Sequence, residues 1–296
     1  MNAAISMTTG KLYGVQRVCH AWEEPRSSFY GSKVRSTSPS VAWKRGPKTA
    51  LSDNELLELI RSDLAASPFV GEGHRKVWAR LRFGRGIRIG RKRVLRVMRE
   101  HHLLSPHRVV QGQPIEHKGK IITAAPNILW GTDGTKIFTL DDGWCWLFTT
   151  VEHWNAECLG WHLAKTGDRF AALQPLSMAL MTRFDSVDAD VARGLALRMD
   201  NGTQYLSDHF QNQIKYWGIA PSFAFVAEPE TNGVTERFNR TLKEQVINGR
   251  QYRNIEELRI AIAAFIDLYN EYWLVEKLGF KSPRQAYNEH QLMVAA

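Results

Sequence analysis

Two short stretches decide the fold: residues 196–202 read ALRMDNG, and residues 232–243 read NGVTERFNRTLK. The first is an apolar run that predicts a buried strand, and the strand ends at Asp200, where Asn-Gly turn chemistry follows. In the second stretch apolar side chains recur every four residues, which predicts a helix with one buried stripe. These side chains are Val234, Phe238, Leu242 and Val246.

Glu236 stands two positions after Val234, about 200° around the helix, and therefore on the polar face. Arg240 and Lys243 follow on the same face, one and two turns later. A carboxylate at the end of a strand and another on a helix face, with 35 residues between them, are a candidate pair of metal ligands. A third carboxylate is then expected upstream, and Asp133 fits that role.

The charge of the chain is unevenly distributed. Of 296 residues, 44% are hydrophobic and 23% charged, which is typical of a globular protein with one large domain and one or two small ones. Residues 1–110 carry 21 Lys and Arg against 8 Asp and Glu, whereas residues 111–296 carry 18 against 22. This basic first third predicts a polyanionic partner, most simply nucleic acid.

Three scattered cysteines are too few for a disulfide framework or a zinc site. The first eight residues have no basic segment leading into an apolar one, and no window approaches the roughly 18 apolar residues of a membrane span. We therefore expect a cytoplasmic protein with no membrane partner.

The first third of the chain predicts short helices. A weak helical pattern covers residues 13–22, and residues 31–49 are interpreted as a flexible basic link. A capping box formed by Ser52 and Glu55 predicts a helix start. Two further helices are predicted at 73–82 and 90–102, and the last is crowded with arginine. Three short helices with a glycine-containing break favour a variant of the helix-turn-helix.

Residues 71–110 hold twelve Lys and Arg against two Glu. Such a density favours contact with DNA or RNA over a merely solvated face, because these charges would otherwise only repel one another. The candidate DNA-binding residues of this segment are Arg75, Lys76, Arg91, Lys92, Arg93 and Arg96.

From residue 128 onward the residue pattern changes from helical to one typical of strands alternating with helices. Two β-branched and aromatic runs, 129–140 and 144–151, are joined by Asp-Asp-Gly, which predicts a hairpin. Three antiparallel strands and then alternating helices and strands predict an α/β domain with a mixed sheet. The further elements are a strand at 157–164, a helix within 169–183 whose start is left open by Pro175, a strand ending at Asp200, a helix at 208–217, a strand at 221–226 and a helix at 255–273.

Each carboxylate has an ordinary explanation when taken alone. Asp133 could neighbour a turn or a sheet edge, Asp200 could cap its own turn, and Glu236 could pair across one helical turn. Together they suit phosphodiester chemistry, which needs hard oxygen ligands that hold two Mg²⁺ ions about 4 Å apart.

Three polar residues beside these carboxylates are candidates for DNA contact. Lys243 and Arg240 would reach phosphates near the metal ions. Asn201, directly after Asp200, could touch a base or a phosphate. For Lys243 a snorkelling surface lysine remains the alternative.

These motifs resemble the DDE retroviral-integrase core of bacterial insertion-sequence transposases. The resemblance rests on Asp133, on residues 200–205 (DNGTQY), and on residues 232–238 (NGVTERF) with Lys243 seven positions after the glutamate. More narrowly, the chain is similar to the second-reading-frame product (OrfB) of the insertion-sequence-three family, over nearly its whole length.

Three further segments carry the resemblance. Residues 13–30 resemble the family's opening helix, residues 71–104 resemble its helix-turn-helix segment, and residues 255–283 resemble its C-terminal tail. Trp273 and Val275 stand where many relatives have Arg and His, so no catalytic role is assigned there.

The resemblance implies an α/β fold, a ribonuclease-H-like mixed five-stranded sheet flanked by helices, preceded by a small all-α helix-turn-helix-type domain. The expected domains are an N-terminal helix and basic linker (1–49), a helix-turn-helix-like DNA-binding segment (50–107), a linker (108–126), the integrase catalytic core (127–250) and a C-terminal helical tail of the core (251–296).

The implied activity is that of a DDE-type polynucleotidyl transferase. Asp133, Asp200 and Glu236 would hold two Mg²⁺ ions, with Mn²⁺ as a substitute, for strand cleavage and strand transfer. The expected partners are the DNA of element ends and target, the upstream-frame transposase product or its frameshift fusion, and further copies of the chain on DNA. The expected location is the bacterial cytoplasm, at the nucleoid. A metal-dependent nuclease of the same fold and a non-catalytic DNA-binding regulator of transposition remain as alternatives.

Overall fold

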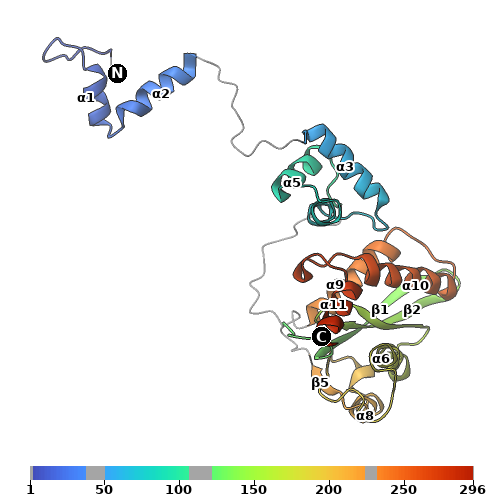
Figure 1. Cartoon of the computed structure of the whole chain (residues 1–296). Helices are drawn as coiled ribbons and strands as arrows, with labels where there is room; N and C mark the ends of the chain where they lie inside the picture. Colours follow the sequence, from blue (N-terminus) through green and yellow to red (C-terminus); the bar gives the residue numbers. More distant parts are fainter. Residues whose placement is uncertain (1–2, 38–50, 107–121, 224–231, 296) are drawn as a thin grey trace. The chain divides into compact units, whose positions relative to one another are not determined.

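The computed structural model describes residues 3–37, 51–106, 122–223 and 232–295 (Figure 1). The chain divides into two compact units, Met1–Ala50 and Leu51–Ala296. The first unit holds α1 (Gly14–Ala21), which confirms the predicted helix, and α2 (Arg26–Thr37).

Helix α2 was missed by the sequence reasoning. The prediction of a flexible link from residue 31 is wrong up to residue 37, and residues 38–49 lie outside the described residues. The backbone N–H groups of Ser28 and Phe29 donate to the carbonyl of Pro25, which starts the helix. Its sequence, RSSFYGSKVRST, has no apolar period that would reveal it.

The second unit begins with the three predicted helices. They are α3 (Asp53–Ala66), α4 (His74–Ala79), which continues into the π-helical turn η1 (Arg80–Gly84), and α5 (Arg91–Glu100). The capping box is confirmed, since Ser52 N donates to Glu55 Oε2 at 2.7 Å and Glu55 N donates to Ser52 Oγ at 3.2 Å. A small core joins the three helices and includes Leu56, Ile60, Val77, Leu81, Val94 and Met98.

A mixed five-stranded sheet forms the centre of the remaining chain. Its strands are β1 (Leu129–Thr139), β2 (Gly143–Glu152), β3 (Cys158–Ala164), β4 (Ala196–Met199) and β5 (Ala220–Phe223), in the order β3-β2-β1-β4-β5. The first three are antiparallel, as predicted, and β1–β4 and β4–β5 are parallel. Gly143, with φ of 72°, turns the predicted hairpin. Residues 224–226 of the predicted last strand lie outside the described residues.

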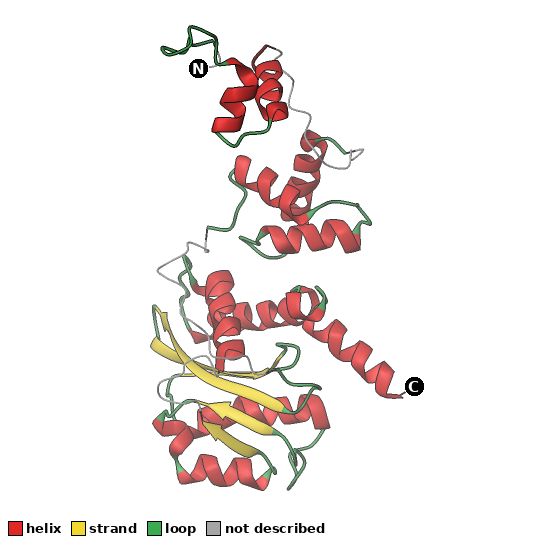
Figure 2. Ribbon diagram, turned by 90° about the vertical axis from the view of Figure 1, so that its left-hand side faces the viewer, coloured by secondary structure: helices red, strands yellow, loops and turns green. Residues whose placement is uncertain are grey.

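Helices cover both faces of the sheet (Figures 1 and 2). One face carries α6 (Arg169–Phe184), α7 (Thr203–Leu206) and α8 (Asp208–Tyr216), and the other carries α9 (Gly233–Leu242), the π-helical turn η3 (Lys243–Ile247) and α10 (Ile255–Tyr272). The short 3₁₀ helix η4 (Glu276–Leu278) and α11 (Pro283–Ala295) follow. The predicted mixed five-stranded sheet flanked by helices, with a helical region before it, is confirmed.

Two local details add to the predictions. Helix α6 starts at an N-cap, Asp168, and runs through Pro175, which settles the start that the proline left open. The short helix α7 was not predicted. In the described part of the chain, every helix is too short or too polar to cross a membrane.

Strand alternation decides which side chains face α9. Trp130 of β1 and Leu197 of β4 belong to the core on the α6 side, together with Phe148 of β2. Because neighbouring strand residues point to opposite faces, Asp133 of β1 faces α9. The same alternation, continued one residue past β4, directs Asp200 to the α9 side.

Candidate active site

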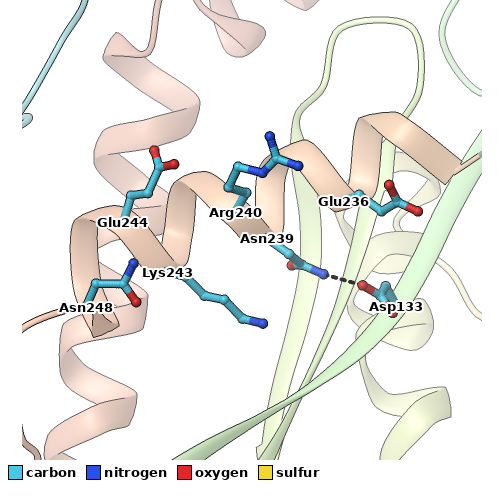
Figure 3. Close-up of a pocket in the computed structure, with 7 residues that line it drawn as sticks. All are labelled: Asp133, Glu236, Asn239, Arg240, Lys243, Glu244 and Asn248. Atoms are coloured by element: carbon cyan, nitrogen blue, oxygen red, sulfur yellow. Dashed lines mark hydrogen bonds between the residues drawn. The ribbon is translucent and has the colours of Figure 1, made fainter. Parts of the chain in front are cut away.

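Asp133 lies in the middle of β1 and is held by two hydrogen bonds. Its Oδ1 accepts from the backbone N–H of Gly134 at 2.8 Å, and its Oδ2 accepts from Asn239 Nδ2 at 2.8 Å. Asn239 is itself fixed, because Thr149 Oγ1 donates to its Oδ1 at 3.1 Å. This relay, which we call the Thr149–Asn239–Asp133 relay, ties β2, α9 and β1 together and fixes the orientation of the carboxylate. Figure 3 shows its bond between Asn239 and Asp133.

The strand register brings Asp200 beside Asp133. Strands β1 and β4 are parallel, with Gly131 paired to Arg198, and two further positions along each strand lead to the two aspartates. Asp200 is exposed, and its Oδ1 accepts from the backbone N–H of Gly202 at 2.9 Å. The Asn-Gly sequence thus forms the predicted tight turn directly after the strand.

Glu236 lies in the first turn of α9 and shares a pocket with Asp133 (Figure 3). The pocket measures about 430 Å³, and the predicted residues Arg240 and Lys243 both line it. The full lining is Asp133, Glu236, Asn239, Arg240, Lys243, Glu244 and Asn248. The helical spacing therefore placed the glutamate and the two cations on one face, as expected.

The carboxylates of the site affect one another electrostatically. Burial raises the pKa of Asp133, and the charge of Asp200 raises it further, while the hydrogen bond from Asn239 opposes the shift. Burial also raises the pKa of Glu236, again with a contribution from Asp133, and Arg240 opposes it. All three negative charges are therefore linked through Asp133, and a cation among them would relieve their repulsion.

The donor set is suited to a hard divalent ion. The three acidic side chains offer only oxygen, as Mg²⁺ requires, and the described neighbourhood contributes no thiolate. Within the described ranges, no three His, Cys, Asp or Glu side chains lie close enough together to hold a metal ion. Asp200 is the member that stands apart, since it is bonded to its own turn and does not line the pocket.

The other predicted DNA-binding residues lie in two environments. Asn201 is exposed beside Asp200, and Lys92 is exposed on α5. Most of the cations of α4 and α5 form ion pairs: Arg75 and Arg91 with Glu276, Lys76 with Glu72, Arg93 and Arg96 with Asp53, and Arg96 also with Glu100. Lys76 also lies over the ring of Trp273, at 2.6 Å from its centroid.

Sequence reasoning missed Asn239. The residue stands three positions after Glu236, so helical spacing places it near the glutamate. A buried asparagine on the sheet side of a helix is an unusual choice, because its amide needs partners there. The place of Asn239 directly beside the apolar residue Phe238 could be seen in the sequence. The partners of Asn239, which are Thr149 and Asp133, follow only from the strand register.

Comparison with known proteins gives the same domain pair. An integrase core domain matches residues 123–229, a second integrase core domain model matches residues 217–283, and an HTH-like domain matches residues 52–110.

Individual relatives and one solved structure show the extent of the similarity. The transposase for insertion sequence element IS629 of Shigella sonnei is 24% identical over 93% of this chain and 91% of its own. Transposase InsD for insertion element IS2D of Escherichia coli is 27% identical over 82% of each chain. The HTLV-2 integrase catalytic core domain in complex with magnesium is 19% identical, with a TM-score of 0.39 over 55% of this chain and 98% of its own. The chain thus carries an integrase core behind an HTH-like domain, and its homologues are insertion-sequence transposases, consistent with an OrfB transposase of the insertion-sequence-three family.

Proposed function

We propose that this chain is the catalytic part of an insertion-sequence transposase. It cleaves a phosphodiester at the end of the element and directs the freed 3′-hydroxyl at a second phosphodiester. The observation that carries the proposal is the pocket in which Asp133 and Glu236 lie together with Arg240 and Lys243, within an integrase core.

Asp133, Asp200 and Glu236 are the proposed ligands of two Mg²⁺ ions, with Mn²⁺ as a substitute. When bound, the ions activate the attacking oxygen and stabilise the leaving oxygen. The protein's own contribution would be to supply three carboxylates, from β1, the end of β4 and α9, of which Asp133 and Glu236 line one pocket and Asp200 would turn toward them when the ions bind. Binding requires their ionised forms, and the charge of Lys243 favours ionised Asp133 by lowering its pKa.

The cations of α9 would position the DNA. Arg240 and Lys243 lie one and two turns beyond Glu236 and line the same pocket, so a strand whose scissile phosphate reaches the carboxylates passes their side chains. Contacts of this kind hold phosphates and orient the strand without reading its sequence.

Further parts of the proposal concern organisation and partners. The proposal includes the domain boundaries given above and DNA contact by the basic residues of α4 and α5 and by Asn201. It also includes assembly of several copies on two element ends and cooperation with the upstream-frame product. A place in the bacterial cytoplasm, at the nucleoid, is part of it as well. The basic excess of residues 1–110 and the HTH-like match support binding of DNA.

The proposal is tested by strand transfer on a labelled, pre-cut element end in Mg²⁺. The chain is assayed with and without its upstream partner, beside Asp200→Asn. We expect joined product that the substitution removes. Cleavage without joining would identify a nuclease, and DNA binding without chemistry, with the partner present, would identify a regulator.

Asn239→Leu is expected to lower strand transfer about 10- to 100-fold, as is usual when a residue that orients a metal ligand is lost. Of the donors among the described residues, the substitution leaves the Asp133 carboxylate with the Gly134 N–H alone. The loss should be partly recovered by raising the Mg²⁺ concentration. Asn248→Leu is the matched comparison, because Asn248 lines the same pocket, while the hydrogen bonds that Asp133 accepts in the described part of the chain come from Gly134 and Asn239. Equal effects of the two substitutions would contradict an orienting role.

A further inference from the structure

Buried polar atoms gather beneath the first turn of α9. His153, Asn232 and Thr235 are 4%, 6% and 0% exposed. Among the described residues, four of their side-chain atoms find no hydrogen-bond partner at normal distances and angles: Nδ1 and Nε2 of His153, Oδ1 of Asn232 and Oγ1 of Thr235. Such a gathering is unusual, because buried polar groups are nearly always paired.

All three residues meet above Gly131 of β1. A Cβ atom on Gly131 would collide with Thr235 Oγ1 and would lie 2.7 Å from Asn232 Oδ1 and 3.0 Å from His153 Nε2. The absence of a side chain at this glycine therefore lets the start of α9 and the histidine approach β1 and one another.

His153 is anchored by its backbone. It directly follows β2, its N–H donates to the carbonyl of Leu129 at 3.0 Å, and its own carbonyl accepts from Lys277 Nζ at 2.6 Å. Asn232, the N-cap residue of α9, donates from Nδ2 to the carbonyl of Thr132 at 3.3 Å. The backbone of His153 and the start of α9 are thus each tied to β1, and their polar side-chain atoms meet at Gly131.

The ring is suited to a neutral hydrogen-bonding role. A neutral imidazole has one donor and one acceptor nitrogen, and the amide oxygen of Asn232 and the hydroxyl of Thr235 are complementary to them. Burial, followed by the charges of Lys277 and Arg198, lowers the pKa of His153 to about 4, while the interaction with Asn232 opposes that shift.

We propose that His153 is a positioning residue that fixes the first turn of α9 against β1 and so sets the place of Glu236 opposite Asp133. Glu236 follows Thr235 directly, and a helical turn moves as a unit, so a displacement at Thr235 carries the glutamate with it. The Thr149–Asn239–Asp133 relay attaches the next turn of α9. The consequence for catalysis rests on the proposed function, whereas the positioning of α9 does not.

The test compares amide hydrogen exchange of residues 233–242 in the full chain with that of 255–272, which serves as an internal reference. His153→Leu removes both ring nitrogens and should speed exchange in α9 about tenfold or more, with α10 unchanged. His153→Gln keeps a donor and an acceptor and should restore the wild-type rate. His162→Leu, at the half-buried histidine of β3, is the matched control and should leave α9 unchanged.

Gly131→Ala provides a second route to the same result, since its Cβ would displace Thr235 and should loosen α9 in the same local way. In strand transfer, His153→Leu should raise the Mg²⁺ concentration for half-maximal activity several-fold without changing DNA affinity, and His153→Gln should not. Unchanged exchange in α9, or equal increases in α9 and α10, overturns the positioning role. A wild-type chain that joins no DNA contradicts the proposed function alone, because the exchange measurement still decides the place of α9.

Discussion

Glu236→Gln is expected to reduce strand transfer by about three orders of magnitude or more, since losing a ligand that positions a metal ion removes several kcal/mol of transition-state stabilisation at 1.36 kcal/mol per tenfold. DNA affinity should change little, because an amide replaces a carboxylate of the same shape and no cation is lost. The measurement is joining of a labelled pre-cut end in Mg²⁺, with binding followed separately on the same DNA. Full strand-transfer activity in the variant would contradict the proposed function.

Stability measurements separate this loss from unfolding. The folded-state pKa of Glu236 is raised by burial and by the charge of Asp133. A carboxyl of this kind favours the folded state at low pH, and that contribution is lost as the pH rises through its folded pKa. At neutral pH the uncharged glutamine avoids the penalty, so the Tm of Glu236→Gln should equal or exceed that of the wild type. The difference should vanish in acid.

Magnesium and a matched variant complete the comparison. Mg²⁺ should raise the Tm of the wild type, because a ligand that binds only the folded state stabilises it, and should do so less for Glu236→Gln. Glu256→Gln is the control, since Glu256 also stands in the first turn of a helix with an arginine partner, here Arg259 in α10. Both activity and the Mg²⁺ response should survive in the control. A similar loss in both variants would point to general charge effects.

The polar face of α9 was predictable because its information is local. Helical spacing alone puts Glu236, Arg240 and Lys243 on one side, and all three line the pocket. The partners of Asn239 and His153 were not predictable in this way. They depend on the pairing of β1 with β2 and on the approach of α9 to β1. Asn239, for example, lies 90 positions from Thr149 and 106 from Asp133.

The same limit applies to the basic helices. Counting charges between residues 71 and 110 correctly identifies a cationic segment. The count does not include the acidic residues from other parts of the chain that pair with these cations. Asp53, about 40 positions earlier, pairs with Arg93 and Arg96, and Glu276 pairs with Arg75. These pairs are partly exposed, and exposed pairs contribute little to stability, so DNA phosphates would compete with them at modest free-energy cost.

Arg183→Met is expected to lower the free energy of unfolding by about 3–5 kcal/mol, the usual result of leaving one member of a buried ion pair alone. Arg183, in the last turn of α6, pairs with Glu157, and their side chains are only 3% and 5% exposed. The guanidinium also packs on the ring of Tyr287, at 3.6 Å from its centroid, so it joins α6 to α11. Denaturant unfolding followed by tryptophan fluorescence measures the change.

A double variant distinguishes the unpaired charge from lost packing. After Arg183→Met, Glu157 keeps Asn155 Nδ2 as a donor, at 3.0 Å, and this neutral partner does not compensate a buried carboxylate. Adding Glu157→Gln removes the unpaired negative charge, while Asn155 can still donate a hydrogen bond to the amide oxygen of the glutamine. If the unpaired charge dominates, the double variant should be more stable than Arg183→Met by most of the initial loss. If it is no more stable, the contact with Tyr287 carries the energy, and Tyr287→Leu should then destabilise the chain as much as Arg183→Met does.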